Sequence, residues 1–439
     1  MKMNLFAMLS LFVFAESAFA QDTLKLTLQD ALGSAMRNNN EIALAKLDQE
    51  SAAARFGQTN AVFLPKVNLS YTAMATNNPL NAFGFKLQQQ SVSPADFNPE
   101  LLNNPPATEN YMAKVEWNQP LLNLDMIYQR KAAKQQMDVY YYKKERTKEY
   151  LAFEMQKAYA QLQLSHQSVS VLKEALSTSN SVFKTSQNFF EQGYLQKSDL
   201  LLVQVQVASL ESKLAEATSI VQNASDYISL LMGVQGNIVY AVAPLDKVIE
   251  AETEMTQVPG DRADFKALTS ALQAQEIMVN ATRMSLLPKL NAFANYLIND
   301  KAITGFGSSS YLIGVQFSWN IFNGTSSHYQ TAEQKIAYSR IEQQLSYQKE
   351  QSQLELNKAL RQLQDAEVAL QQHDISVNQA AEALRILKNR FEQGLASTND
   401  VLKSQSALSE QKLLRSEAVF KYNTTLAYLH FLTSTHENK

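Results

Sequence analysis

Cysteine is absent from all 439 residues of the sequence. Disulfides, thiolate catalysis and a lipid-modified N-terminal cysteine are therefore excluded. Charge is nearly balanced, with 39 basic and 42 acidic residues and a net charge of -3, which gives no reason to expect nucleic acid as a partner. No apolar run beyond the N-terminal segment approaches the ~18 residues of a helical membrane span. The protein is not expected to cross a membrane by helices.

Glycine and proline are also scarce, with 12 and 10 copies. From Leu121 to Met232 the only one of either type is Gly193, and from Thr325 to Lys439 the only one is Gly394. Because these two residue types interrupt helices, each half of the chain predicts one very long helix, a glycine turn and a helix that returns antiparallel.

The two predicted helical hairpins are copies of each other. The segment Phe190–Gly193 recurs as Phe391–Gly394, displaced by 201 positions. In the helix before each turn, an apolar residue recurs at every seventh position. These residues are Met155, Leu162, Val169, Leu176, Phe183 and Phe190 in one copy, and Leu356, Leu363, Leu370, Val377, Leu384 and Phe391 in the other. Such a repeat predicts helices that pack with left-handed supercoiling.

Four segments switch to alternating apolar and polar residues, which is typical of β-strands. They are expected to form two hairpins, at residues 64–120 and 287–320. The connection at 77–110 is rich in asparagine and proline and is interpreted as an irregular exposed loop. Six aromatic residues stand near the strand ends, where the aromatic girdles of a membrane barrel would lie. They are Tyr71, Tyr111, Trp117, Tyr296, Tyr311 and Trp319.

Four strands of about ten residues have the length that crosses a bilayer at a tilt. In lipid, an open sheet leaves backbone groups unpaired, and four strands cannot close into a barrel alone. Three copies, each giving four strands, would make a barrel of about twelve strands with an open lumen, so a homotrimer is predicted. The polar residues of the strands would line water: Asn68, Ser70, Lys114, Glu116, Gln316 and Ser318. The alternative is a small soluble sheet that caps a coiled-coil stalk.

The start of the chain predicts export. Lys2 precedes an apolar run at 5–15 and then Ala18–Ala20, which is the order of a secretory signal with its cleavage site. The mature chain is expected to begin at Gln21.

The predicted fold class is mostly α with β. A signal peptide at 1–20 is followed by a first structural repeat at 21–232, a mixed linker at 233–260 and a second repeat at 261–439. Each repeat is expected to hold a helix, a β-hairpin and a long helical hairpin. The first helix, at 27–63, is expected to break at its run of asparagines.

No constellation of residues points to catalysis or cofactor binding. The five histidines form no pair at metal-ligand spacing on one helical face. A phosphate loop and a nucleophile elbow are also absent from the sequence. Enzyme activity, a cofactor and a bound metal are therefore not expected.

The chain resembles the TolC family of outer-membrane efflux and secretion channels. The resemblance is carried by the duplication, the two glycine tips and four junctions between helix and strand. These junctions are Leu64-Pro65-Lys66, Leu287-Pro288-Lys289, Trp117–Asn123 and Trp319–Gly324. It covers the chain after the signal peptide and implies a trimeric conduit, an outer-membrane β-barrel continued by a periplasmic α-helical barrel. Its tips would dock on a periplasmic adaptor protein joined to an inner-membrane transporter, in an efflux pump or a type I secretion system.

The resemblance also implies roles for residues at the two tips. The adaptor would meet Gly193, Tyr194, Leu195, Gly394, Leu395 and Ala396. Acids just past the tip would ring a periplasmic gate, where Asp400 matches the first such acid and Asp199 is its repeat partner. Lys403 stands where well-known members carry a second acid, which puts a strongly cation-selective entrance in doubt. The alternative for both aspartates is helix capping alone.

A periplasmic coiled-coil scaffold or adaptor without a pore is the competing function. Trp117 and Trp319 at the ends of alternating strands argue against it, because a soluble scaffold has no need for them.

Overall fold

The computed structural model describes residues 23–248 and 257–435, and the predicted signal peptide lies outside them. The chain divides into two compact units. The first unit combines Met1–Ile42, Lys148–Thr256 and Glu355–Thr433, and the second combines Ala43–Thr147, Gln257–Leu354 and Ser434–Lys439. Helices α5 (Leu124–Glu191) and α8 (Ser326–Glu392) contribute residues to both units.

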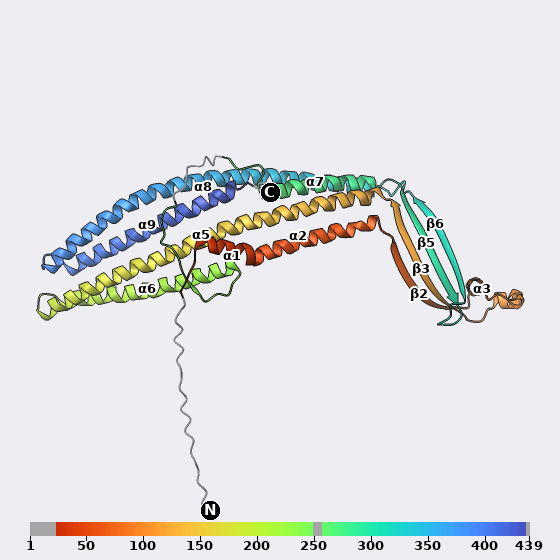
Figure 1. The fold of residues 1–439 in the computed structure, drawn as a ribbon, viewed down its shortest axis with the longest axis horizontal. Coiled ribbons are helices and arrows are strands. Elements are labelled where there is room, and N and C mark those ends of the chain that lie inside the picture. Colours follow the sequence, from red (N-terminus) through yellow and green to blue (C-terminus); the bar gives the residue numbers. More distant parts are fainter. Residues whose placement is uncertain (1–22, 249–256, 436–439) are drawn as a thin grey trace, which may run out of the picture. The chain divides into compact units, whose positions relative to one another are not determined.

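Two long helical hairpins make up most of the first unit (Figure 1). In one of them α5 returns as α6 (Lys197–Met232), and in the other α8 returns as α9 (Thr398–Thr433). The prediction of two long hairpins from the scarcity of glycine and proline is confirmed.

Each hairpin turns on its predicted glycine. Gly193 has a φ of +79° and Gly394 a φ of +72°, in the left-handed region that favours glycine. Nothing lies within 4 Å of the place where a Cβ would stand at either position, so the backbone angle requires glycine and crowding does not. In both turns the N–H of the following residue, Tyr194 or Leu395, donates to a carbonyl of the preceding helix at 2.8 Å. This bond belongs to a Schellman motif, and the two turns share it.

The apolar residues at every seventh position are buried as predicted in the middle of α5, where Met155 and Leu162 are both 0% exposed. Nearer the tip, the buried face moves back by one residue. Val182 is buried there, whereas the predicted Phe183 is half-buried and Phe190 is exposed. The buried face of α5 therefore departs from the strict seven-residue repeat near the tip.

The second unit contains a four-stranded antiparallel sheet in the order β2-β3-β5-β6. Its strands are β2 (Lys66–Thr76), β3 (Thr108–Leu122), β5 (Lys289–Asp300) and β6 (Ser308–Ser318). Both predicted β-hairpins are present, and the pairing of β3 with β5 joins them into one sheet. Strands β2 and β6 each pair on one side only, so the sheet has two open edges.

The prediction of an irregular loop between β2 and β3 was wrong. Three short helices fill this connection: α3 (Pro79–Gln88), the 3-10 helix η2 (Pro94–Phe97) and α4 (Pro99–Asn103). Each begins with proline as its first residue, behind an asparagine or serine cap. Asn78, for example, accepts a hydrogen bond from the backbone N–H of Asn81 at 3.2 Å. The asparagines and prolines therefore mark helix starts rather than irregular backbone.

Two smaller features complete the first unit. The break in the first helix is confirmed, because α1 (Leu28–Asn38) ends before the buried Asn39, whose Nδ2 donates to Leu231 O at 2.8 Å. In the segment expected to be a mixed linker, β4 (Val239–Ala241) pairs in parallel with β1 (Thr23–Lys25). Strands of three residues are too short to show a period.

The second unit also holds α2 (Asn40–Gln58) for most of its length, η1 (Thr59–Val62) and α7 (Ala263–Met284). Among the described residues, no helix has both the length and the hydropathy of a membrane span.

Candidate functional sites at the hairpin tips and on the sheet

The tips of the two helical hairpins pack against each other within the first unit. Val182, Val203, Phe391 and Val401 form a buried cluster there, and each is at most 3% exposed. The ring of Phe189 meets that of Phe391 edge-on, with centroids 5.7 Å apart. The tips are therefore joined by apolar packing and not only by the chain.

A groove of about 520 Å³ lies between the tips. Four of the predicted docking residues line it, namely Tyr194, Leu195, Gly394 and Ala396. Tyr194 is 80% exposed, and Leu395, outside the lining, is 63% exposed. An exposed tyrosine and leucine beside a groove are the features of a protein-binding surface.

Asp400 lies in the first turn of helix α9 and takes part in its cap, which does not distinguish capping alone from capping with a gate role. Ser397 Oγ donates to Asp400 Oδ2 at 2.7 Å. The backbone N–H of Asp400 donates to Ser397 Oγ at 3.2 Å, and the backbone N–H of Ser397 donates to Asp400 Oδ2 at 3.3 Å. These bonds form a capping box. The hydrogen bonds from the side chain and backbone of Ser397, and then the charges of Lys403 and Arg390, lower the pKa of Asp400.

Asp199 differs from its repeat partner. The position equivalent to Ser397 holds Gln196, whose side chain makes no capping bond to α6. Asp199 instead lies half-buried among the residues that line the groove between the tips. Lys403 is exposed one turn beyond Asp400. The structure therefore separates the two aspartates that the sequence treats as equivalent.

Buried polar atoms at the tips were missed by sequence reasoning. Ser179, Ser186, Thr398 and Gln405 are at most 4% exposed, and each has a side-chain oxygen without a partner in the described part of the chain. An unpaired buried oxygen costs about 1–3 kcal/mol. Two of the four, Ser179 and Ser186, each stand three residues after an apolar residue of the seven-residue repeat. This spacing was the one sign in the sequence that they would be buried.

One face of the sheet is apolar and exposed. Strand register places Tyr296 opposite Tyr311, Tyr71 opposite Ala113, and Trp117 opposite Ala294, all on this face. Tyr111 stands toward the loop end, Tyr71 in the middle of β2, and Trp117 and Trp319 toward the helix end. Tyr296 and Tyr311 lie one row from Trp117 on the same face. The same face carries exposed aliphatic and aromatic side chains, of which Leu69 is 77%, Ile313 71% and Phe317 65% exposed.

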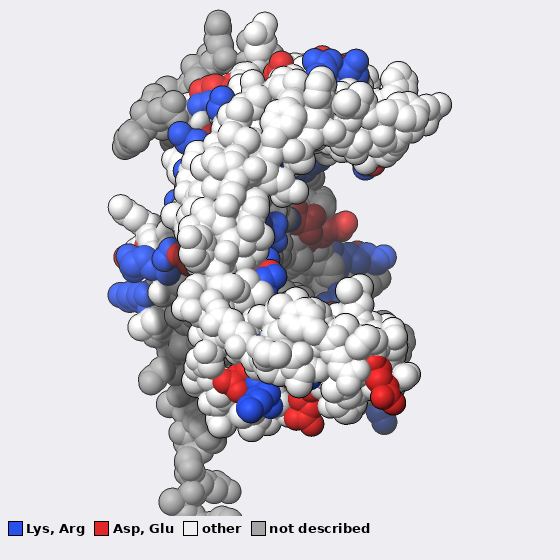
Figure 2. Space-filling model, turned by 90° about the vertical axis from the view of Figure 1, so that its right-hand side faces the viewer, with Lys and Arg blue, Asp and Glu red and all other residues white. Residues whose placement is uncertain are grey.

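Figure 2 shows the side of the molecule that carries the sheet. Much of this end is free of charged residues, and Lys, Arg, Asp and Glu gather toward its margins. An exposed surface of this kind is typical of contact with lipid.

The other face of the sheet is polar, as predicted. The register places Asn68 opposite Glu116 and Ser70 opposite Lys114, and Lys114 and Glu116 form an ion pair on this face. Gln316 pairs with Asn291 and Ser318 with Lys289 in the same manner.

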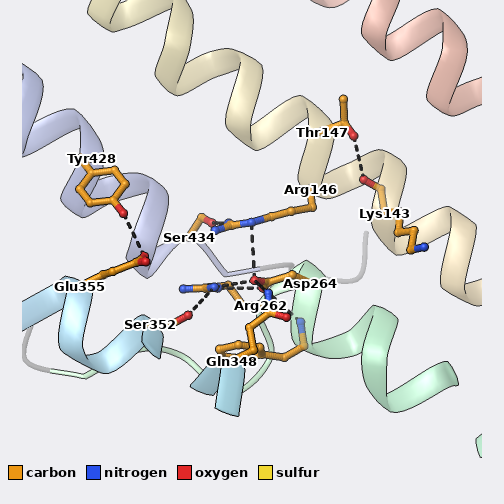
Figure 3. A network of polar contacts seen from close by, with 11 residues as sticks. Lys143, Arg146, Thr147, Arg262, Asp264, Gln348, Ser352, Glu355, Tyr428 and Ser434 are labelled. Carbon is orange, nitrogen blue, oxygen red and sulfur yellow. Dashed lines mark hydrogen bonds and ion pairs between the residues drawn. The ribbon is translucent and has the colours of Figure 1, made fainter. Parts of the chain in front are cut away.

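A separate polar network ties α7 to its neighbours in the second unit (Figure 3). The buried Arg262 donates to both carboxylate oxygens of Asp264, at 2.8 and 2.5 Å, and to Ser352 at 2.9 Å. Burial by itself would raise the pKa of Asp264, but the bond from Arg262 and the charges of Arg146 and Arg262 lower it. The charged groups of Arg262 and Asp264 have hydrogen-bond partners within the network, so we assign it a structural role in holding α7 to its neighbours. No group of metal-binding side chains occurs among residues 23–248 and 257–435.

Long paired helical hairpins, joined to an antiparallel sheet that exposes an apolar face, define a subunit of the TolC-like class of outer-membrane channels. The chain belongs to the outer membrane efflux protein family, which matches it over residues 31–234 and 257–434. Membership of this family places the protein in the cell outer membrane.

Solved structures share this fold. The outer membrane protein VceC from Vibrio cholerae superposes with a TM-score of 0.72 at 16% identity, over 93% of this chain and 97% of that chain. The CmeC outer membrane channel of Campylobacter jejuni gives a TM-score of 0.73 at 17% identity, over 92% and 85%. The open state of the MtrE outer membrane channel of Neisseria gonorrhoeae gives 0.72 at 15% identity, over 92% and 88%. No curated protein matches the chain by sequence.

Proposed function

We propose that three copies of this chain form the exit duct of a tripartite efflux pump or a type I secretion system. The observation that carries the proposal is a sheet with one exposed apolar face and two open edges. Strand direction alternates across the sheet, so β2 and β6 run in opposite directions. Strand β6 of one copy can therefore pair antiparallel with β2 of the next.

Closure of the sheet into a barrel removes every open edge, which the bilayer requires. Three copies supply about twelve strands, enough for a lumen that side chains do not fill. The apolar face, with its four tyrosines and with Trp117 and Trp319, then meets lipid. The polar face with its Lys114–Glu116 pair lines water.

The exported chain begins at Gln21 after loss of the signal peptide 1–20. It contains two structural repeats, 21–232 and 261–439, around a linker at 233–260. The duct carries solutes outward without chemistry of its own, and its partners supply the energy.

The paired tips form the periplasmic end of the duct. A periplasmic adaptor protein docks there, with Tyr194, Leu195 and Ala396 in its contact surface, and connects the duct to an inner-membrane transporter. Gly193 and Gly394 hold the turns that present this surface, and Leu395 stands exposed beside it. The unpaired polar oxygens of Ser179, Ser186, Thr398 and Gln405 weaken tip packing, which favours a tip that opens.

Asp199, Asp400 and Lys403 form the charged part of the gate at this end. Asp400 has two roles in this proposal, the cap of α9 and a charge at the entrance. Replacing it with asparagine keeps the shape of the side chain and removes the charge. A change in ion selectivity across a planar bilayer supports the gate role, and unchanged conductance and selectivity leave only the cap. Glu382→Gln, on the exposed surface of α8, is the control.

Native mass spectrometry of the protein extracted from outer membranes in mild detergent tests the assembly. The expected species is a trimer of the processed chain. A monomer or dimer recovered from the soluble periplasm would overturn the duct and favour a scaffold without a pore.

A further inference from the structure

A recess of about 760 Å³ lies in the second unit, at the base of the sheet where strands join helices. Its polar lining is unusual in composition, with six amide side chains, one cation and no acid. The amides are Gln58, Asn60, Asn118, Gln119, Asn291 and Gln316, and the cation is Lys66.

Two of the amides are oriented by neighbouring donors. Arg130 Nη1 donates to Asn60 Oδ1 at 2.6 Å, and Asn123 Nδ2 donates to Asn291 Oδ1 at 3.0 Å. With these carbonyl oxygens engaged, the NH₂ groups of Asn60 and Asn291 are the parts of the two side chains left to donate to a solute. Gln119 is oriented the other way, since its Nε2 donates to Pro120 O at 2.9 Å.

The charge around the recess is positive. The nearby carboxylates already have cationic partners, because Glu116 pairs with Lys114 and Asp125 pairs with Lys289 at 2.6 Å. Lys66 makes no ion pair among the described residues. Arg130 contacts the neutral oxygens of Thr59 and Asn60 and lies over the rings of Phe56 and Phe63. Two cations without a carboxylate partner thus stand beside amide donors.

Strand register places four residues of this recess, Lys66, Asn118, Asn291 and Gln316, on the polar face. Lys66 pairs with Asn118, and Asn291 pairs with Gln316, in the same alternation that holds Asn68 and Ser70. If that face lines the lumen, as the proposed function requires, every solute that leaves through the barrel passes the recess.

We propose that this recess is a transit site for anionic solutes, small amphipathic molecules that carry a carboxylate, sulfonate or phosphate group. Lys66 and the amide N–H groups receive the anion, because charge-assisted hydrogen bonds from such donors are the strong ones. Leu64, Pro65, Pro120 and Met126 in the lining give an apolar surface for the rest of the molecule. The proposal rests on the proposed duct.

The absence of cysteine makes a single introduced thiol a specific probe of this site. In the variant Asn118→Cys, the thiol stands directly across the strand pair from Lys66. Its rates of modification by the anionic reagent sulfonatoethyl methanethiosulfonate and by the cationic trimethylammonioethyl methanethiosulfonate are measured on the purified assembly. Adding Lys66→Gln is expected to lower the ratio of the anionic to the cationic rate about three-fold or more. Adding Lys46→Gln, on the exposed surface of α2, is the matched control and leaves the ratio unchanged.

Protection of the thiol tests binding directly. Naphthalenedisulfonate is expected to slow modification of the thiol by the neutral reagent methyl methanethiosulfonate. A trimethylammonium naphthalene is expected not to slow it. In the Lys66→Gln variant, the difference in protection between the two compounds should disappear. Equal protection by both compounds, or a ratio of rates that Lys66→Gln leaves unchanged, overturns the transit site. Neither outcome bears on the proposed duct. A thiol in an intact assembly that none of the reagents reaches overturns the duct itself, because the polar face then does not meet water.

Discussion

The ring of Phe189 packs edge-on against that of Phe391, with centroids 5.7 Å apart, although the repeat partner of Phe391 is Phe190. Phe391 is 3% exposed and Phe190 is 38% exposed. The duplicated tip sequence thus folds into two unlike packing environments, because the buried face of α5 near the tip lies one residue before the seven-residue repeat.

Phe391→Ala is expected to loosen the tips, since truncation of a buried phenylalanine costs about 3–5 kcal/mol. Hydrogen exchange at the backbone amides of residues 182–203 and 384–402 would rise. Phe190→Ala, at the same position of the other repeat, removes an exposed ring and is expected to change the exchange little. Equal effects of the two variants would contradict the asymmetric packing.

Gly394→Ala is expected to destabilise its turn by about 1–2 kcal/mol, because the residue has a φ of +72° and an L side chain strains there. Gly57→Ala is the control, a glycine inside α2 with open space around its Cβ position and no positive φ. There alanine is expected to stabilise by up to about 1 kcal/mol. Thermal unfolding of the two variants should shift in opposite directions, and a common direction would refute the turn argument.

Arg262→Ala is expected to destabilise the protein by about 3 kcal/mol, because it leaves the largely buried carboxylate of Asp264 without its closest cation. In Arg262→Ala/Asp264→Ala the loss should be clearly smaller than the sum of the two single losses. The exposed pair Arg385–Glu382 is the control, where Arg385→Ala should cost about 0–1 kcal/mol. Denaturant unfolding provides all four values, and additive losses at the first pair would show that the two residues do not act together.

Acid is expected to unfold the connection between β2 and β3 in a defined range. The hydrogen bond from Lys86 lowers the pKa of Asp96 from 3.8 to about 2. A carboxyl group whose pKa is lowered on folding stabilises the folded form above its ordinary pKa, and this stabilisation is lost as the pH falls. The helices α3, η2 and α4 should therefore lose this support between pH 3.8 and about 2.

Limited proteolysis of residues 79–103 by pepsin across this range measures the effect. Asp96→Asn should make cleavage easier at pH 4 and remove the rise in susceptibility, relative to the denatured chain, that the wild type shows between pH 3.8 and about 2. Glu100→Gln, in the neighbouring α4, is the control and should keep the wild-type profile. Identical profiles for all three proteins would show that Asp96 does not hold the connection.

Sequence alone predicts the parts of this fold that repeat. Apolar residues at seven-residue spacing, such as Met155 and Leu162, show the buried face of a long helix. Isolated glycines, Gly193 and Gly394, show where the helices turn, because each signal is contained in a short stretch of sequence. Alternation shows the strands for the same reason. The roles assigned to the tip and gate residues remain predictions.

What sequence missed depends on contacts between distant segments. The pairing of β1 with β4 joins residues more than two hundred positions apart and leaves no period in three residues. The difference between Asp199 and Asp400 depends on Gln196 in place of Ser397, a single exchange whose effect is seen only in the capping geometry. The amide-lined recess draws on four separate stretches of chain, and no single stretch carries its pattern.

The two open edges of the sheet bear on how the protein is made. A folded single chain would expose two strands with an unpaired edge and a large apolar surface to water. Such edges can pair with other extended polypeptides and cause aggregation. The separate folded chain is therefore expected to aggregate. In the proposed trimeric duct these two edges become paired only when the copies associate, so folding of the sheet and association of the copies are expected to be coupled.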